Sequence, residues 1–121
     1  MYLDVFEPDG VFEMFERDDL DTPLRRTSGH DEMGGNLRDL ERLFRRTMHL
    51  VGNSLYEFHG DEARGEVYCV AHHLGGVPPG GTDYVMYIRY YDTYVRGSDG
   101  EWRIRTRRLV TEWTESLAAD T

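Results

Sequence analysis

Two arms rich in aromatic and β-branched residues, DYVMYIRYYDTYVR (residues 83–96) and EWRIRTRRLVTEW (residues 101–113), flank the short linker GSDG (residues 97–100). This composition favours strands, and the Gly/Ser/Asp linker is typical of a hairpin loop, so the sequence predicts two long antiparallel strands. Both alternating faces of the first arm carry aromatic or aliphatic side chains. We therefore expect both faces of the sheet to be covered at least in part.

The first 35 residues show little periodicity. We expect at most a short helical turn before a Pro-Asp-Gly turn at residues 8–10, and then a strand over residues 11–15. Residues 16–35 are predicted to be a loop that contains one short strand near residues 25–27.

The middle of the chain predicts one helix and a second hairpin. Asn36 is a good N-cap, and apolar residues recur at helical spacing after it, which indicates a helix over residues 37–47. Strands are expected over residues 49–58 and 62–74, joined by a tight turn, and a flexible loop follows over residues 75–82.

These elements describe a single α+β domain over residues 1–121, in which a strongly bent antiparallel sheet is closed on one side by a helix. One amphipathic helix is too little to cover such a sheet. We expect either a further helix upstream of Met1 in a longer natural product or cover from a partner subunit.

The composition narrows the classes of function. A formal charge of −9 argues against nucleic acid or an anionic membrane as the main partner. Lysine is absent, which excludes a Schiff base on a lysine amine and a P-loop lysine. Cys69 is the only cysteine, and no apolar run approaches the length of a membrane span, so we expect a cytoplasmic protein without cofactors.

Three segments together carry a resemblance to a known family: TMHLVGNSLYEFHGDEA (residues 47–63), YDTYVR (residues 91–96) and DGEWRIRTRRLV (residues 99–110). From about Asp4 to Trp113 the chain resembles the SnoaL-like branch of the nuclear-transport-factor-2-like (NTF2-like) superfamily. That branch includes polyketide cyclases, scytalone dehydratase, bile-acid 7α-dehydratase and hexachlorocyclohexane dehydrochlorinase. The resemblance implies a cone in which a curved sheet wraps around helices and encloses a mostly apolar pocket, and a homodimer formed through the outer sheet face.

The resemblance also implies two catalytic residues. His49 matches the general base of the dehydratase and dehydrochlorinase members, and Arg107, five residues beyond Trp102, matches an arginine that holds or polarises the leaving group. A neutral imidazole can remove a proton from carbon at neutral pH, and a fixed guanidinium can stabilise a developing anion. Those enzymes orient the histidine with an aspartate on an N-terminal helix, and no residue of this chain matches that aspartate.

The expected pocket has eight further lining residues. They are Phe15, Phe44, Tyr68, Val70, His72, Met86, Ile88 and Tyr90. Strand alternation places Ile104 and Arg107 on opposite faces, so both can face the pocket only if a bulge lies between them. The adjacent histidines at positions 72 and 73 point to opposite faces for the same reason, which argues against a metal site.

The leading hypothesis is a cofactor-free lyase or isomerase, dehydratase-like or cyclase-like, that acts on a small apolar or polycyclic organic molecule with His49 as general base. The alternative is a non-catalytic ligand-binding or dimerisation module of the same fold. A third possibility is an accessory subunit similar to the small β-subunit of ring-hydroxylating oxygenases, which would need a large partner.

Overall fold

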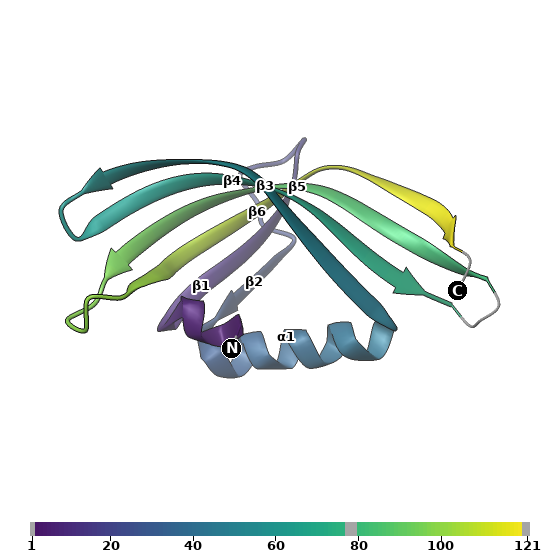
Figure 1. Ribbon diagram of the computed structural model, residues 1–121, viewed down its shortest axis with the longest axis horizontal. Coiled ribbons are helices and arrows are strands. Elements are labelled where there is room, and N and C mark those ends of the chain that lie inside the picture. Colours follow the sequence, from purple (N-terminus) through teal and green to yellow (C-terminus); the bar gives the residue numbers. More distant parts are fainter. Residues whose placement is uncertain (1, 77–79, 120–121) are drawn as a thin grey trace.

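The computed structural model describes residues 2–76 and 80–119, and these form a six-stranded sheet that arches over helix α1 (Figure 1). The strands are β1 (Phe6–Glu16), β2 (Arg25–Ser28), β3 (Arg46–His59), β4 (Glu62–Gly75), β5 (Gly81–Arg96) and β6 (Trp102–Ala119). They lie in the order β2-β1-β6-β5-β4-β3. The β1–β6 pair is parallel and all the other pairs are antiparallel. The predicted α+β class with a strongly curved sheet is confirmed, but the sheet is mixed rather than antiparallel throughout, because β1 joins it beside β6 in the parallel direction.

The hairpin of β5 and β6 is the longest feature of the sheet, as the sequence predicts. The two strands pair from Gly81 with Ala119 to Arg96 with Trp102, which extends β6 six residues beyond the predicted end at Trp113. The turn between them closes through a hydrogen bond from the Gly100 N–H to the Gly97 carbonyl. Gly100 has φ +83°, a conformation in which glycine is favoured.

The N-terminal segment differs from the expected turn. The short 3₁₀ helix η1 (Tyr2–Val5) leads directly into β1, so residues 8–10 lie inside a strand. The pairing of β1 with β6 shifts register between Phe6 and Val11, and the Pro-Asp-Gly sequence occupies that irregularity. Proline lacks the N–H that a regular ladder needs, which explains why it lies at such an interruption. The predicted short strand near residues 25–27 is confirmed as β2.

The predicted helix over residues 37–47 is wrong at both ends. Helix α1 spans Gly29–Leu43, and its N-cap is Ser28 rather than Asn36. The Glu32 carboxylate accepts a hydrogen bond from the Ser28 N–H at 2.7 Å, while the Asn36 side chain donates to the Thr27 hydroxyl. The paired glycines at positions 34 and 35 hide the helical pattern in the sequence, because glycine disfavours helix interiors.

The sheet has two distinct faces, which we call concave (toward α1) and convex. Met33 of α1 packs against Phe6 and Ile104 and fixes the concave side. A second cluster on the same face forms the centre of the core; it contains Val67, Cys69, Ala71, Ile88, Tyr90 and Leu109.

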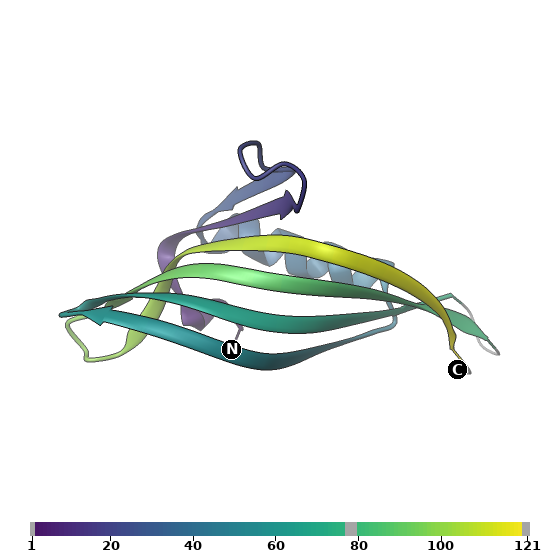
Figure 2. The same cartoon turned by 90° about the horizontal axis from the view of Figure 1, so that it is seen from above.

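Helix α1 does not cover the whole concave face. It contacts mainly β1 and β2, and Figures 1 and 2 show it beneath that side of the arch. All 14 residues of β3, at the far edge, are exposed. The expectation that one helix is too little to cover the sheet is therefore confirmed. No helix among residues 2–76 and 80–119 is long and apolar enough to cross a membrane.

Candidate functional site

Two histidines meet on the concave face, one from β3 and one from β4. His49 lies opposite Ala71 in the ladder, and its ring centroid is 6.1 Å from that of His73. His73 is buried and its ring also contacts Phe44, at 5.1 Å. Its Nδ1 lies 2.9 Å from the Tyr84 carbonyl, which can only accept, so Nδ1 carries the proton and donates. His73 is thereby held in one orientation beside His49.

The position of His49 favours its neutral form. The residue lies on an exposed edge strand, but its ring contacts the ring of His73 on the concave side. Burial lowers the pKa of His49 below its usual value, and the neighbouring His73 and Arg107 lower it further. At neutral pH the imidazole is therefore unprotonated and able to accept a proton. No carboxylate among the described residues forms a hydrogen bond with His49.

Arg107 is fixed by a buried ion pair. Its Nε and Nη2 donate to the two carboxylate oxygens of Asp92 at 2.9 and 2.8 Å, and the Asp92 side chain has no exposed surface. The Tyr94 hydroxyl donates to the same carboxylate at 2.6 Å. The Arg107 guanidinium also lies over the Tyr90 ring, 4.0 Å from its centroid. Burial and the hydrogen bond to Asp92 raise the pKa of Tyr94, so it remains a neutral donor.

A bulge in β6 places Arg107 on the concave face. In the pairing of β5 with β6, Thr93 lies opposite Thr106 but Tyr94 lies opposite Ile104, so Arg105 is the extra residue. In a regular strand the side chains of Ile104 and Arg107 would point to opposite faces. The extra residue shifts the alternation by one position, so both side chains lie on the concave face. The sequence predicts that Ile104 and Arg107 can face one pocket only if a bulge lies between them, and the structure contains that bulge.

A hollow of about 310 Å³ opens on the concave face beside this ion pair. Its lining is mainly apolar and aromatic, with contributions from four strands and from η1. It includes Val51, Tyr56, Tyr90, Tyr94, Trp102 and Arg107. Phe58 packs edge-on against Trp102, with ring centroids 5.5 Å apart, and extends the aromatic surface at this end. A hollow of this kind suits a small, largely apolar molecule with one or two polar groups.

The sheet separates the eight predicted pocket residues into two groups. Phe44, Met86, Ile88 and Tyr90 lie on the concave side, and of these Tyr90 lines the hollow. The other four lie on the convex face. They are Phe15, Tyr68, Val70 and His72.

The placement of those four residues corrects the predicted pocket. Tyr68 lies opposite Arg89, and Val70 lies opposite Tyr87, one residue out of phase with the buried Ile88. Phe15 lies beneath the convex-face guanidinium of Arg108, 4.6 Å from its carbon. The sequence shows which residues of a strand share a face, but it does not show which face turns toward the helix.

Three residues of the site were missed by the sequence reasoning, namely His73, Asp92 and Tyr94. A signal for Asp92 was present, because it is the one acid between Tyr90 and Tyr94 on the predicted aromatic face of the strand. A carboxylate at such a position needs a buried cation, and strand pairing supplies Arg107 directly opposite.

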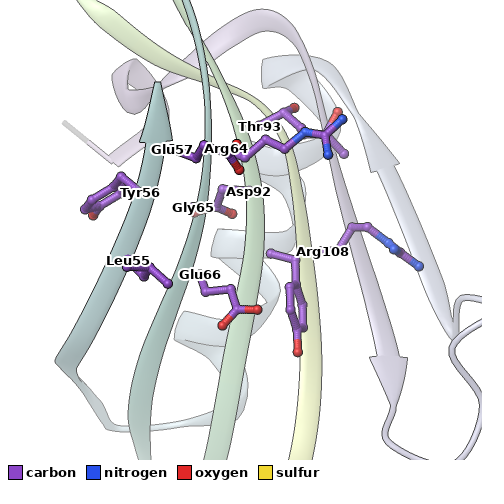
Figure 3. Close-up of a pocket in the computed structure, with 11 residues that line it drawn as sticks. Leu55, Tyr56, Glu57, Arg64, Gly65, Glu66, Asp92, Thr93 and Arg108 are labelled. Atoms are coloured by element: carbon purple, nitrogen blue, oxygen red, sulfur yellow. The ribbon is translucent and has the colours of Figure 1, made fainter. Parts of the chain in front are cut away.

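A second hollow, of about 540 Å³, lies on the convex face and is separated from His49 by the sheet. Figure 3 shows its lining side chains, with Leu55 on β3, Arg64 and Glu66 on β4 and Arg108 on β6; the helix lies behind the sheet in this view. Its charges are mixed, and neither of the proposed catalytic residues contributes to it.

The adjacent histidines of β4 point to opposite faces, as strand alternation predicts. His72 is on the convex face, where its Nδ1 lies 2.7 Å from the Asp83 carboxylate, whereas His73 is on the concave face. In the described part of the chain no three His, Cys, Asp or Glu side chains are grouped so that they could hold a metal ion.

Comparison with known proteins identifies the family. The model of the SnoaL-like domain family matches residues 2–108, which is most of the chain. The chain belongs to this SnoaL-like family. No curated protein matches the SnoaL-like chain in sequence.

Solved structures share the SnoaL-like fold. A scytalone dehydratase-like protein of Novosphingobium aromaticivorans is 24% identical, with a TM-score of 0.72; the match covers 98% of this chain and 71% of that one. A Mycobacterium tuberculosis protein of unknown function is 27% identical, with a TM-score of 0.73, over 92% of this chain and 58% of that one. A hexachlorocyclohexane dehydrochlorinase of Novosphingobium barchaimii is 15% identical, with a TM-score of 0.73, and the match covers 95% of this chain and 73% of that one.

Proposed function

We propose that this SnoaL-like protein is a cofactor-free lyase or isomerase, dehydratase-like or cyclase-like, that acts on a small apolar or polycyclic organic molecule. The observation that carries the proposal is the position of His49 and Arg107 on the same concave face, close enough for Arg107 to lower the pKa of His49. Arg107 lines the aromatic hollow, and Val51, two residues beyond His49 on the same face of β3, lines it too.

In the proposed reaction the neutral imidazole of His49 takes a proton from a carbon of the substrate. The electron pair of that C–H bond moves into the substrate, where it forms an enolate or expels a leaving group. The Arg107 guanidinium, held in place by Asp92, stabilises the oxygen or leaving group that becomes negative. The apolar and aromatic walls of the hollow strengthen this electrostatic effect because they lower the local polarity beside the guanidinium.

Electrostatics favour an uncharged substrate. Asp92 balances the charge of Arg107, and Asp99 pairs with Arg103 at the rim, at 2.7 Å. With a neutral His49, these ionic groups of the hollow sum to no net charge. A neutral molecule with a carbonyl or hydroxyl group therefore fits the site better than a carboxylate or phosphate, whose charge would remain uncompensated.

A second candidate, a non-catalytic ligand-binding or dimerisation module, is favoured by one observation. No described carboxylate orients His49, and an imidazole without such a partner loses part of the stabilisation of its protonated form.

In either case we propose a homodimer through the convex face, where Tyr87 and Trp113 stack at 4.4 Å and Trp113 is 57% exposed. The cytoplasmic location stays a prediction.

The two candidates can be separated by comparing binding with turnover. Hydroxylated polycyclic ketones are titrated into the wild type, His49→Ala and Arg107→Gln, and their conversion is followed by liquid chromatography. The enzyme hypothesis predicts that His49→Ala binds within about threefold of the wild type but loses at least about a hundredfold in turnover, the usual contribution of a general base. His59→Ala, an exposed histidine of the same strand, serves as control. Binding without turnover in the wild type would support the binding module instead.

A further inference from the structure

Strand β3 is a long open edge of the sheet. It pairs with β4 on one side, and the described part of the chain places no strand on its other side. All 14 of its residues are exposed. The opposite edge, β2, has only four residues and contacts α1. The outward N–H and C=O groups of β3 therefore form an extended template for a further strand.

The centre of β3 has few of the features that normally prevent edge pairing. Residues 48–56, MHLVGNSLY, contain no acidic or basic residue other than a histidine, and no proline. Met48, Leu50 and Leu55 on its convex side are 67%, 63% and 72% exposed. The one feature of this stretch that disfavours edge pairing is the bulge at residues 52–53, which lie together opposite Tyr68. Natural edges of this length usually carry charges or proline as well.

The charges at the two ends of the strand are complementary. Arg46 lies at the start of β3 and Glu57 near its end, and both are on the convex side. Arg46 has no ion-pair partner among the described residues, and the Glu57 carboxylate contacts only the exposed His59, at 3.1 Å. An antiparallel copy of β3 would place Arg46 against Glu57 twice, whereas a parallel copy would place Arg46 against Arg46. The strand is therefore self-complementary only in the antiparallel direction.

The same alignment matches the side chains between the two ends. With Arg46 opposite Glu57, Met48 lies opposite Leu55 on the convex side. On the concave side, His49 lies opposite Ser54. The bulge at the centre shifts the alternation by one residue, which keeps the faces matched on both arms of the strand.

We propose that β3 is a self-association edge, separate from the convex-face contact proposed above, where a second copy of this chain adds its own β3 in antiparallel orientation about a two-fold axis. The two sheets then form one continuous sheet across both chains, with a doubled ion pair at its ends and an apolar contact between. The pairing also closes the exposed side of the site, because it brings the Ser54 hydroxyl of the second copy beside His49. This inference does not depend on catalysis, since it concerns assembly alone.

Charge exchange between the two ends provides the test. Sedimentation equilibrium is measured at about 0.15 M salt, where long-range repulsion between the acidic chains is screened, and each edge variant is also made in Trp113→Glu, which removes the proposed convex-face contact. Arg46→Glu and Glu57→Arg each place two like-charge contacts in the dimer and should raise the dissociation constant about tenfold or more. The double variant restores both pairs with reversed sign and should return to within about threefold of the wild type. Both positions are exposed, so the variants are expected to fold, which circular dichroism verifies.

Three outcomes would overturn the proposal. One is a wild type that remains monomeric over the measured concentrations. Another is a double variant that associates no better than the single variants. The third concerns the convex face: Trp113→Glu should leave the edge contact intact, so loss of all association in Trp113→Glu, with no effect of Arg46→Glu, would assign the interface to that face.

Discussion

The ion pair between Asp92 and Arg107 should contribute strongly to the stability of the fold, and Asp92→Asn tests this. The substitution keeps the shape of the side chain but removes its charge. Two hydrogen bonds from Arg107 and one from Tyr94 end on this carboxylate, which has no exposed surface, and only 15% of the Arg107 side chain is exposed. Breaking one partner of a buried pair costs about 3–5 kcal/mol, and an amide that retains some of the bonds lowers this to about 2–4 kcal/mol.

The loss is large compared with the whole stability of such a domain. At roughly 0.05–0.15 kcal/mol per residue, a chain of 121 residues has about 6–18 kcal/mol in total. Urea unfolding followed by tryptophan fluorescence gives the free energy of each variant. Asp99→Asn is the matched control, because Asp99 makes a similar pair with Arg103 but is half exposed, and its change should be much smaller.

A double-mutant cycle isolates the interaction itself. We expect Asp92→Asn and Arg107→Gln to be coupled by about 2 kcal/mol or more, so that the double variant is far less destabilised than the sum of the two single variants. A coupling below about 0.5 kcal/mol, or an equal effect of Asp92→Asn and Asp99→Asn, would refute the reasoning that burial makes the first pair important.

Three further predictions concern pH, packing and thiol reactivity. Because the folded pKa of His49 is lowered, the unfolded chain binds more protons below about pH 6.5, so the unfolding free energy should fall between pH 7.5 and 5.5, and by less in His49→Gln. In Gly65→Ala the new Cβ would lie 2.9 Å from the Tyr56 and Tyr94 rings, so the folded protein should lose about 1–3 kcal/mol of stability in the same urea assay. Gly35→Ala lies inside α1 and should instead stabilise the fold by about 0.5–1 kcal/mol. Burial raises the pKa of the Cys69 thiol, so a thiol reagent should label it much more slowly in the native protein than in urea, and equal rates would contradict its burial.

Much of the fold could be predicted from local pattern. Both hairpins follow from alternating aromatic and β-branched residues around turn residues, and the structure extends their strands by only a few positions at most ends. The start of α1 could not be found in this way, because Gly34 and Gly35 interrupt its pattern and its contacts are with η1, β1 and β2. Likewise, residues 8–10 have turn chemistry, but the parallel pairing of Phe6 and of Val11 with β6 on either side of them keeps this segment within β1, as an irregularity of the ladder.

The site was only partly predictable for a different reason. His49 and Arg107 were named through the resemblance, and the register of the sheet places both on the concave face, where the bulge at Arg105 sets the position of Arg107. Half of the predicted lining residues lie on the other face, because alternation within a strand does not show which side the helix covers. An acid at position 92 on an aromatic strand face signals a buried cation, but its partner Arg107 lies 15 residues away on the next strand, where a bulge sets the register.

The central claim is that His49 removes a proton from carbon on the concave face of the sheet, and isotope exchange tests it most directly. A hydroxylated polycyclic ketone that binds the protein is incubated in D₂O, and deuterium uptake beside the carbonyl is followed by mass spectrometry. The account predicts uptake catalysed by the wild type and by His59→Ala, and a loss of at least about a hundredfold in His49→Ala. Uptake at the wild-type rate in His49→Ala, or none with the bound wild type, would contradict it.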